Sequence, residues 1–264
     1  MRLLAIPTVI SIEYQVSGTN EAKRFDGERS LMLINKQVRR VAVTAGAAGV
    51  MAASALLGTP APSASADPCP DVDVVFARGS GEPPGVGGVG GSFVDALRGQ
   101  VGGRSLAVYP VNYQASTDFS NPNFPVTVID GIRDAGSHIE SMAANCPKTR
   151  EVLGGYSQGA AVAGFVTSAA VPPGVPAAMV PAPMPPEIAN HVAAVTLFGT
   201  PSDQFLQKYG APTIVIGPLY QPKTLELCAP GDGICGNGSD GFAHAAYTVN
   251  GMTNQAAGFA ASHL

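Results

Sequence analysis

Short apolar runs and longer amphipathic segments alternate along the chain from residue 72 to its end. The helical pattern is clearest in residues 124–145, where Val128, Ile132, Ala135 and Ile139 recur at steps of three and four. Further helices are expected over residues 92–100, over residues 158–167 and from residue 241 onward, and strands over residues 72–77, 105–109, 150–154, 191–198 and 224–227. Strands separated by helices pair in parallel. The pattern therefore predicts an α/β sandwich with a central parallel sheet.

The first 66 residues differ from the rest in charge and in apolar content. They hold seven of the fifteen basic residues but only four of the nineteen acidic ones. An uncharged run rich in Ala, Gly and Val, residues 41–58, follows three basic residues and precedes the Ala-Ser-Ala site at 64–66. This order is typical of a secretory signal peptide, with cleavage after Ala66. A retained membrane anchor is the alternative, but the Ala and Gly content would make a weak spanning helix.

Residues 1–31 fit no part of that pattern, so a start at Met32 would give a signal peptide of ordinary shape. Residues 67–264 would then form one domain with 8 basic and 15 acidic side chains. No later apolar run is long enough to span a bilayer. We expect a secreted protein, extracellular or associated with the cell envelope. The net charge of −4 and the lack of a basic stripe argue against nucleic acid as a partner.

The chain has four cysteines, Cys69, Cys146, Cys228 and Cys235, an even number that suits disulfides in an exported protein. Four cysteines allow three pairings. No C-x-x-C and no histidine at zinc-like spacing accompanies them, so no metal site is expected. The last two enclose a short Gly-rich loop, which favours their pairing and leaves the first two for each other. These each precede a predicted strand, and parallel strands begin at one edge of a sheet.

Residues 85–90 (Gly-Val-Gly-Gly-Val-Gly) match the dinucleotide-binding pattern G-x-G-x-x-G. In a Rossmann fold this motif follows its strand directly, whereas here residues 78–84 intervene with two prolines. Residues 109–112 read Tyr-Pro-Val-Asn where a ribose-binding acid is required. We interpret the motif as a chance match among 32 glycines and expect no cofactor.

Residues 155–159 (Gly-Tyr-Ser-Gln-Gly) match G-x-S-x-G at the end of an apolar strand and directly before a predicted helix. Such a turn holds its serine, here Ser157, in a strained conformation that requires small neighbours. The amide of Gln158, at the helix start, would face a developing oxyanion. The alternative is a Gly-rich turn with an incidental serine, which the strand–turn–helix context disfavours.

A nucleophilic serine of this kind is followed in the chain by an acid and then by a histidine. His191 is expected at the opposite edge of the sheet, and His263 is near a fraying end. His244 is therefore the candidate base, and His138, which precedes the serine, is expected at a solvated helix position. Asp203 and Asp232 compete for the acid, and a Cys228–Cys235 disulfide would favour Asp232 by rigidifying its loop.

Together these motifs resemble the cutinase family, in particular the cutinase-like serine esterases exported by mycobacteria and related actinobacteria. The resemblance extends from Cys69 to the C-terminus. It is carried by residues 76–82 (Phe-Ala-Arg-Gly-Ser-Gly-Glu), by residues 154–159, and by Cys228-x-x-x-Asp232-x-x-Cys235 with His244 twelve residues after the acid.

The resemblance implies a three-layer α/β-hydrolase sandwich and a secreted serine carboxylesterase that hydrolyses lipid or polyester esters through an acyl-enzyme. It implies that Ser157 is the nucleophile, His244 the general base and acid, and Asp232 the orienting carboxylate. Ser80 and Gln158 would form the oxyanion hole, and the family pairs its cysteines as expected above. We expect an ester or lipid substrate, transient contact with a lipid surface and a monomer, without cofactor or metal.

Two other functions are compatible with the same sequence features. An acyltransferase acting on cell-envelope glycolipids would need the same Ser-His-Asp set, and a non-enzymatic exported antigen or adhesion module would need none of it. The Pro-rich segment 171–190, which contains seven prolines, also allows two interpretations. Its composition favours a stiff surface connector over an apolar flap beside the acyl-binding cleft.

Overall fold

The computed structural model describes residues 69–264, so the expected signal peptide and the start at Met32 lie outside the described residues. Five strands form one parallel sheet in the order β2-β1-β3-β4-β5. Their bounds are β1 (Val72–Ala77), β2 (Leu106–Pro110), β3 (Arg150–Tyr156), β4 (Val192–Phe198) and β5 (Thr224–Leu227). The sheet confirms the parallel α/β arrangement predicted from the alternating pattern.

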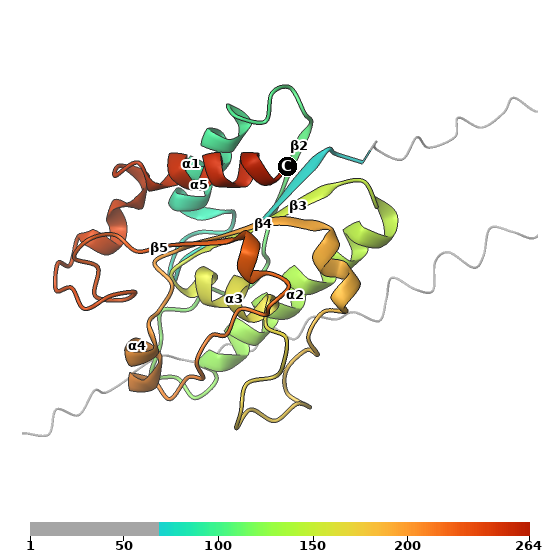
Figure 1. The fold of residues 1–264 in the computed structure, drawn as a ribbon. Coiled ribbons are helices and arrows are strands. Elements are labelled where there is room, and N and C mark those ends of the chain that lie inside the picture. Colours follow the sequence, from blue (N-terminus) through green and yellow to red (C-terminus); the bar gives the residue numbers. More distant parts are fainter. Residues whose placement is uncertain (1–68) are drawn as a thin grey trace, which may run out of the picture. The chain divides into compact units, whose positions relative to one another are not determined.

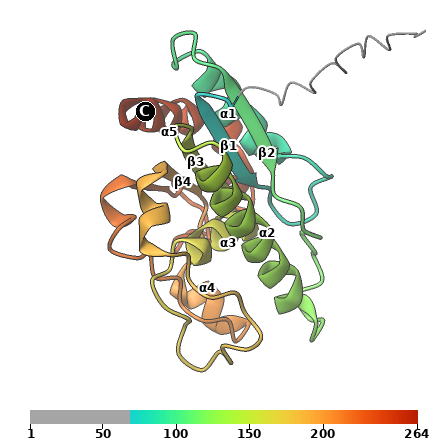
Figure 2. The same cartoon turned by 90° about the vertical axis from the view of Figure 1, so that its right-hand side faces the viewer.

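Helices cover both faces of the sheet and complete three layers (Figures 1 and 2). On one face α1 (Gly87–Arg98) packs beside α5 (Met252–His263), and on the other α2 (Phe124–Asn145) packs beside α3 (Gln158–Val166). Three short elements lie between strands: η1 (Pro186–Asn190), α4 (Asp203–Lys208) and η2 (Gln221–Lys223). A further 3₁₀ turn, η3 (Ala243–Thr248), lies between β5 and α5. Within the described part of the chain no helix is long and apolar enough to cross a membrane.

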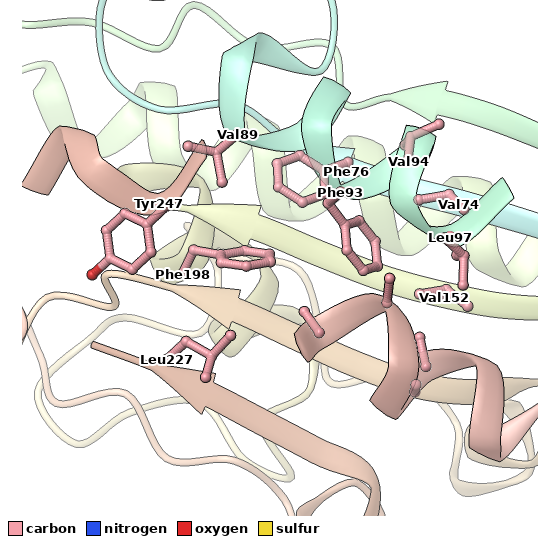
Figure 3. Packing of buried hydrophobic residues seen from close by; sticks show 14 of the residues in the cluster. Val74, Phe76, Val89, Phe93, Val94, Leu97, Val152, Phe198, Leu227 and Tyr247 are labelled. Carbon is pink, nitrogen blue, oxygen red and sulfur yellow. The ribbon is translucent and has the colours of Figure 1, made fainter. Parts of the chain in front are cut away.

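An aromatic cluster fills the layer between the sheet and α1 (Figure 3). The rings of Phe76, Phe93 and Phe198 lie with centroids 5.8–6.3 Å apart, and all three side chains are fully buried. Tyr247 packs edge-on against Phe198 with its ring buried and its hydroxyl directed out of the cluster. Aromatic pairs in these geometries add stability beyond their buried area. The cluster therefore fixes η3, which carries Tyr247, against the sheet.

Helix α1 begins five residues earlier than predicted, inside the Gly-rich motif. Glycine is a poor helix former, so the first turn needs support from elsewhere. The Glu82 carboxylate supplies it, accepting hydrogen bonds from the amides of Gly88 (2.7 Å) and Gly79 (2.6 Å). A Cβ at Gly87 would lie 2.2 Å from this carboxylate. The motif is therefore a helix start whose Gly88 amide already binds a carboxylate of the chain itself.

Two disulfides join Cys69 to Cys146 and Cys228 to Cys235. These are the pairs expected from the sequence. The first links the segment before β1 to the end of α2, at the edge of the sheet where the strands begin. The second closes a loop of the chain directly after β5.

Two histidines differ from their expected positions. His138 is only partly exposed and has partners in the protein: its Nε2 lies 2.7 Å from the buried Asp73 carboxylate, and its ring stacks on Tyr109. His263 is the last residue of α5, and its Nδ1 contacts the Phe259 carbonyl at 2.8 Å. The hydrophobic periodicity of the sequence does not identify these partners, because one lies on another element and the other on the preceding helical turn.

Candidate active site

Ser157 lies in a sharp turn between the last residue of β3 and the first residue of α3. Its φ of 55° and ψ of −116° make it one of two non-glycine residues with positive φ in the described part of the chain. Such backbone strain is typical of functional positions. A Cβ on Gly155 would lie 2.1 Å from the Gly159 carbonyl oxygen, and one on Gly159 would lie 2.0 Å from the Ala77 carbonyl oxygen. Both flanking glycines are therefore sterically required.

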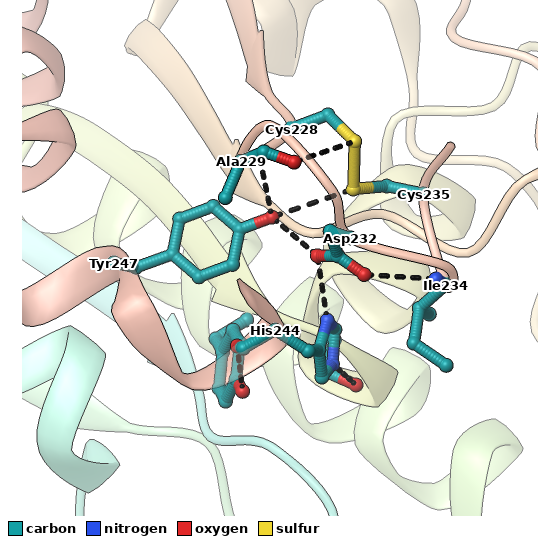
Figure 4. A network of polar contacts seen from close by, with 9 residues as sticks. Cys228, Ala229, Asp232, Ile234, Cys235, His244 and Tyr247 are labelled. Carbon is teal, nitrogen blue, oxygen red and sulfur yellow. Dashed lines mark hydrogen bonds and ion pairs between the residues drawn. A yellow bond between two sulfur atoms is a disulfide. The ribbon is translucent and has the colours of Figure 1, made fainter. Parts of the chain in front are cut away.

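The turn places Ser157 in a hydrogen-bonded chain with two residues from other elements. His244 Nε2 lies 2.8 Å from Ser157 Oγ, and His244 Nδ1 lies 2.8 Å from Asp232 Oδ2 (Figure 4). His244 is in η3, and Asp232 is in the loop after β5. The structure thus brings together the three residues that the chain order indicated. An imidazole in this position can accept the serine proton and return it to a leaving group.

Asp232 is buried (1% exposed) and saturated with donors. Its Oδ1 accepts a hydrogen bond from the Ile234 amide at 2.8 Å, and its Oδ2 accepts one from the Tyr247 hydroxyl at 2.7 Å. Burial alone would raise the pKa of Asp232, but the hydrogen bonds from His244, Ile234 and Tyr247 outweigh it and hold the pKa below its usual range. The carboxylate is therefore ionised and fixed in orientation beside the imidazole.

Two tyrosines that the sequence did not single out support this chain of contacts. The Tyr156 hydroxyl donates to the His244 carbonyl at 2.5 Å and so fixes the backbone that carries the imidazole. The Tyr247 hydroxyl, besides donating to Asp232, accepts a hydrogen bond from the Ala229 amide at 3.1 Å. Tyr156 directly precedes Ser157, but its partner is 88 residues away in sequence, so only the tertiary structure shows the contact.

Ser80 and Gln158 line the same cavity as Ser157 and His244. Gln158 is the first residue of α3, where a helix amide has no partner within the helix. The Ser80 hydroxyl is buried and has no hydrogen-bond partner within residues 69–264. The loop that carries it is anchored by Arg78, whose guanidinium donates to the carbonyls of Glu82 (2.9 Å) and Tyr113 (2.6 Å). Two donors without a partner thus belong to residues that line the same cavity as Ser157.

The cavity itself has a volume of about 1270 Å³, above the 300–1,000 Å³ that is ordinary for small-molecule sites. Its walls are largely apolar. They come from α2, from α4 and from the segment 171–190, and include Phe124, Val128, Ile132, Val175, Met179, Met184, Phe205 and Leu206. Such a cavity accommodates an apolar group attached to the reacting centre.

The Pro-rich segment 171–190 therefore does more than connect α3 to β4. Residues along most of its length line the cavity that contains Ser157, so the preference for a plain surface connector is wrong. Proline fixes the backbone without internal hydrogen bonds, which allows the segment to cross the cavity as a wall. Composition alone could not distinguish these roles, because both need a stiff, apolar chain.

The competing residues lie elsewhere. Asp203 is the exposed first residue of α4 and makes no contact with His244 among the described side-chain hydrogen bonds. His191 follows η1 and precedes β4, at the end of the sheet opposite the Ser157 turn. The structure thus favours Asp232 and His244 over both.

Comparisons with known proteins agree with this geometry. The family model described as Cutinase matches residues 68–264. A "Probable carboxylesterase Culp7" of Mycobacterium tuberculosis is 72% identical over 165 residues, which cover 62% of this chain and 88% of the relative. "Carboxylesterase Culp1" of the same organism is 48% identical over 222 residues, covering 82% and 94%. Among solved structures, a Trichoderma reesei cutinase bound to a phosphonate inhibitor is 32% identical, with a TM-score of 0.54 over 75% of this chain and 78% of that one.

Proposed function

Because the chain belongs to the cutinase family and is a carboxylesterase, we propose that it hydrolyses its ester substrates through a covalent acyl-enzyme on Ser157. The observation that carries this proposal is the unbroken contact chain from Ser157 through His244 to Asp232, at 2.8 Å for each step. The family match favours neither an acyltransferase nor a non-enzymatic adhesion module.

The first half of the reaction forms the acyl-enzyme. Ser157 Oγ attacks the ester carbonyl carbon while its proton passes to His244 Nε2. Asp232 stabilises the imidazolium that results and keeps Nδ1 protonated. The tetrahedral intermediate collapses, the ester C–O bond breaks, and the alcohol leaves with the proton from Nε2.

The second half releases the acid. His244 takes a proton from water, the resulting hydroxide oxygen attacks the acyl carbon, and Ser157 Oγ leaves with the proton returned by His244. In both halves the negative oxygen needs donors. The Gln158 amide and the Ser80 hydroxyl are the groups we assign to it, since both are free and lie on the wall of the same cavity. One such donor is worth about 3–4 kcal/mol of barrier.

The apolar cavity supports lipid esters as the substrate class. A short acyl group would leave most of 1270 Å³ unfilled, whereas a long chain would bury its surface against α2, α4 and the Pro-rich segment at about 25 cal/mol per Å². Secretion through the signal peptide that we expect within residues 1–66, beginning at Met32, fits this class, and the two disulfides fit an oxidising compartment. We place the enzyme outside the cell or at the cell envelope, acting as a monomer of one catalytic domain, residues 67–264.

A serine-to-alanine exchange tests the mechanism. Ser157→Ala should reduce hydrolysis of p-nitrophenyl butyrate by at least about 10⁴-fold and abolish labelling by a fluorophosphonate probe. Ser262→Ala is the control, because the Ser262 hydroxyl donates to the Phe259 carbonyl within α5 and lies outside the cavity wall. Retention of activity in Ser157→Ala would refute the proposal.

A further inference from the structure

Two carboxylates lie next to each other in the core, at the end of the sheet away from Ser157. Asp73 of β1 and Glu151 of β3 are partners in the parallel register, so their side chains leave the same face of neighbouring strands. Asp73 is 2% exposed and Glu151 is 1% exposed. Ser157 is six residues further along from Glu151, a distance of about 20 Å in an extended strand. This pair is therefore not part of the candidate active site.

An imidazole from a third element completes the cluster. His138 of α2 has its Nε2 2.7 Å from Asp73 Oδ2. Its ring stacks on Tyr109 with centroids 3.6 Å apart and planes 8° from parallel, and the Tyr109 hydroxyl in turn donates to Asp134 at 3.1 Å. These contacts fix the ring with Nε2 directed at the carboxylates.

Glu151 lacks the partners that a buried carboxylate requires. Neither of its oxygens has a hydrogen-bond partner within residues 69–264, and no Lys or Arg of those residues forms an ion pair with it or with Asp73. The neighbouring Arg150 and Lys223 donate to backbone carbonyls instead. An unpaired buried carboxylate is strongly unfavourable. A proton on Glu151 could bridge to Asp73, but it would remove only one of the two negative charges. A divalent cation would balance both carboxylates and would bind their oxygens directly.

The three donor atoms are close enough to share one ion. All lie within 4.8 Å of one another. Ligands bound tetrahedrally to zinc at about 2.1 Å are about 3.4 Å apart, so shifts of about 1 Å would close the site. We propose that Asp73, Glu151 and His138 form a binding site for a divalent metal ion, with Zn²⁺ the ion best matched to one imidazole and two carboxylates. The His138 side chain is 20% exposed and provides the route of entry.

The ion would act on stability and not on ester chemistry. It would join β1, β3 and α2 at the end of the sheet where the Cys69–Cys146 disulfide already ties the start of β1 to the end of α2. Because the site is about 20 Å from Ser157, esterase activity should be the same with and without the ion. Metal binding can therefore be tested independently of the catalytic role of Ser157.

Zinc titration tests the site directly. The purified His244→Ala protein, which lacks the imidazole of the candidate active site, is stripped with EDTA, dialysed and titrated with ZnCl₂ by calorimetry while Tm is followed. We expect one Zn²⁺ per chain and a rise in Tm of about 5 °C or more at one hundred times Kd. Glu151→Gln in this background should weaken binding about 100-fold or more and remove the rise in Tm. Glu187→Gln, at an exposed position of η1, should change neither.

A second variant keeps the test decisive if Glu151→Gln fails to fold. His138→Gln removes the imidazole from a partly exposed position, and it should weaken zinc binding as strongly. The inference is overturned if the protein shows no saturable zinc binding up to about 1 mM. It is equally overturned if binding is unchanged in the folded variants of both Glu151 and His138, since the ion would then bind elsewhere.

Discussion

The Tyr247 hydroxyl lies 2.7 Å from Asp232 Oδ2, the same oxygen that lies 2.8 Å from His244 Nδ1. Burial raises the pKa of Tyr247, so its hydroxyl keeps its proton and remains a donor. The chain of contacts that begins at Ser157 thus has a fourth member, which fixes the acid from the side away from the imidazole (Figure 4). Tyr247 is a positioning residue and does not touch the reacting atoms.

Removing this hydroxyl should weaken catalysis without abolishing it. Tyr247→Phe keeps the ring in the aromatic cluster but leaves Asp232 with one donor fewer, a loss of about 1.5–3 kcal/mol for a bond to a charged group. We expect kcat for p-nitrophenyl butyrate to fall about tenfold with KM little changed. Tyr220→Phe is the control, because the Tyr220 hydroxyl is buried, has no hydrogen-bond partner within residues 69–264 and lies outside the cavity wall. An unchanged kcat in Tyr247→Phe would show that Asp232 needs no such support.

Asp232→Asn should affect both rate and acid stability. The variant should lose about 10³–10⁴-fold in kcat, since an amide no longer stabilises the imidazolium. The pKa of Asp232 is lowered in the folded state, so its stabilising contribution is complete above the unfolded value near 3.9 and is lost as the pH falls through the lower folded value. The difference in free energy of unfolding between wild type and variant should therefore shrink as the pH is lowered from about 5 to about 2. Urea denaturation at each pH measures it, and a difference that widens towards low pH would contradict the assignment.

The Pro-rich wall should set the preference for acyl chain length. Met179 lines the cavity and is 58% exposed, so Met179→Glu should fold while placing a charge beside a bound chain. We expect kcat/KM for p-nitrophenyl palmitate to fall about tenfold and that for p-nitrophenyl acetate to stay within about twofold. Val215→Glu, equally exposed but outside the cavity, controls for added charge. Equal losses on both esters in Met179→Glu would show that the segment does not bind the acyl chain.

The two disulfides should differ in what their loss affects. Replacing Cys69 and Cys146 by serine removes the disulfide that closes a loop of 77 residues. This change should lower the free energy of unfolding by about 4.5 kcal/mol, with kcat retained at 20 °C. Replacing Cys228 and Cys235 by serine removes the disulfide that closes a loop of seven residues, and should lower the free energy of unfolding by about 2.5 kcal/mol. Because this loop holds Asp232, its release should also lower kcat at least tenfold. Thermal unfolding and initial rates of both variants test this contrast, which fails if the second pair can be removed without loss of rate.

Sequence patterns predicted most of the strands and helices because these elements depend on residues that are close together in the chain. The strand, the strained turn and the helix around Ser157 are contiguous, and the acid loop is marked by its two cysteines, so both could be recognised along the chain. The contacts of Tyr156, Tyr247 and His138 could not, since each joins residues that only the packing of layers brings together. Helix α4 was missed because six residues are too few to show a period.

The central claim is that Ser157 carries the acyl group, and mass spectrometry of a trapped adduct tests it most directly. The purified protein is incubated with a long-chain alkyl p-nitrophenyl phosphonate, digested and mapped. One adduct per chain should appear on the peptide that contains Ser157, with release of one equivalent of p-nitrophenol, and Ser157→Ala should form none. An adduct on another residue, or an unmodified wild-type protein that still hydrolyses esters, would contradict the account.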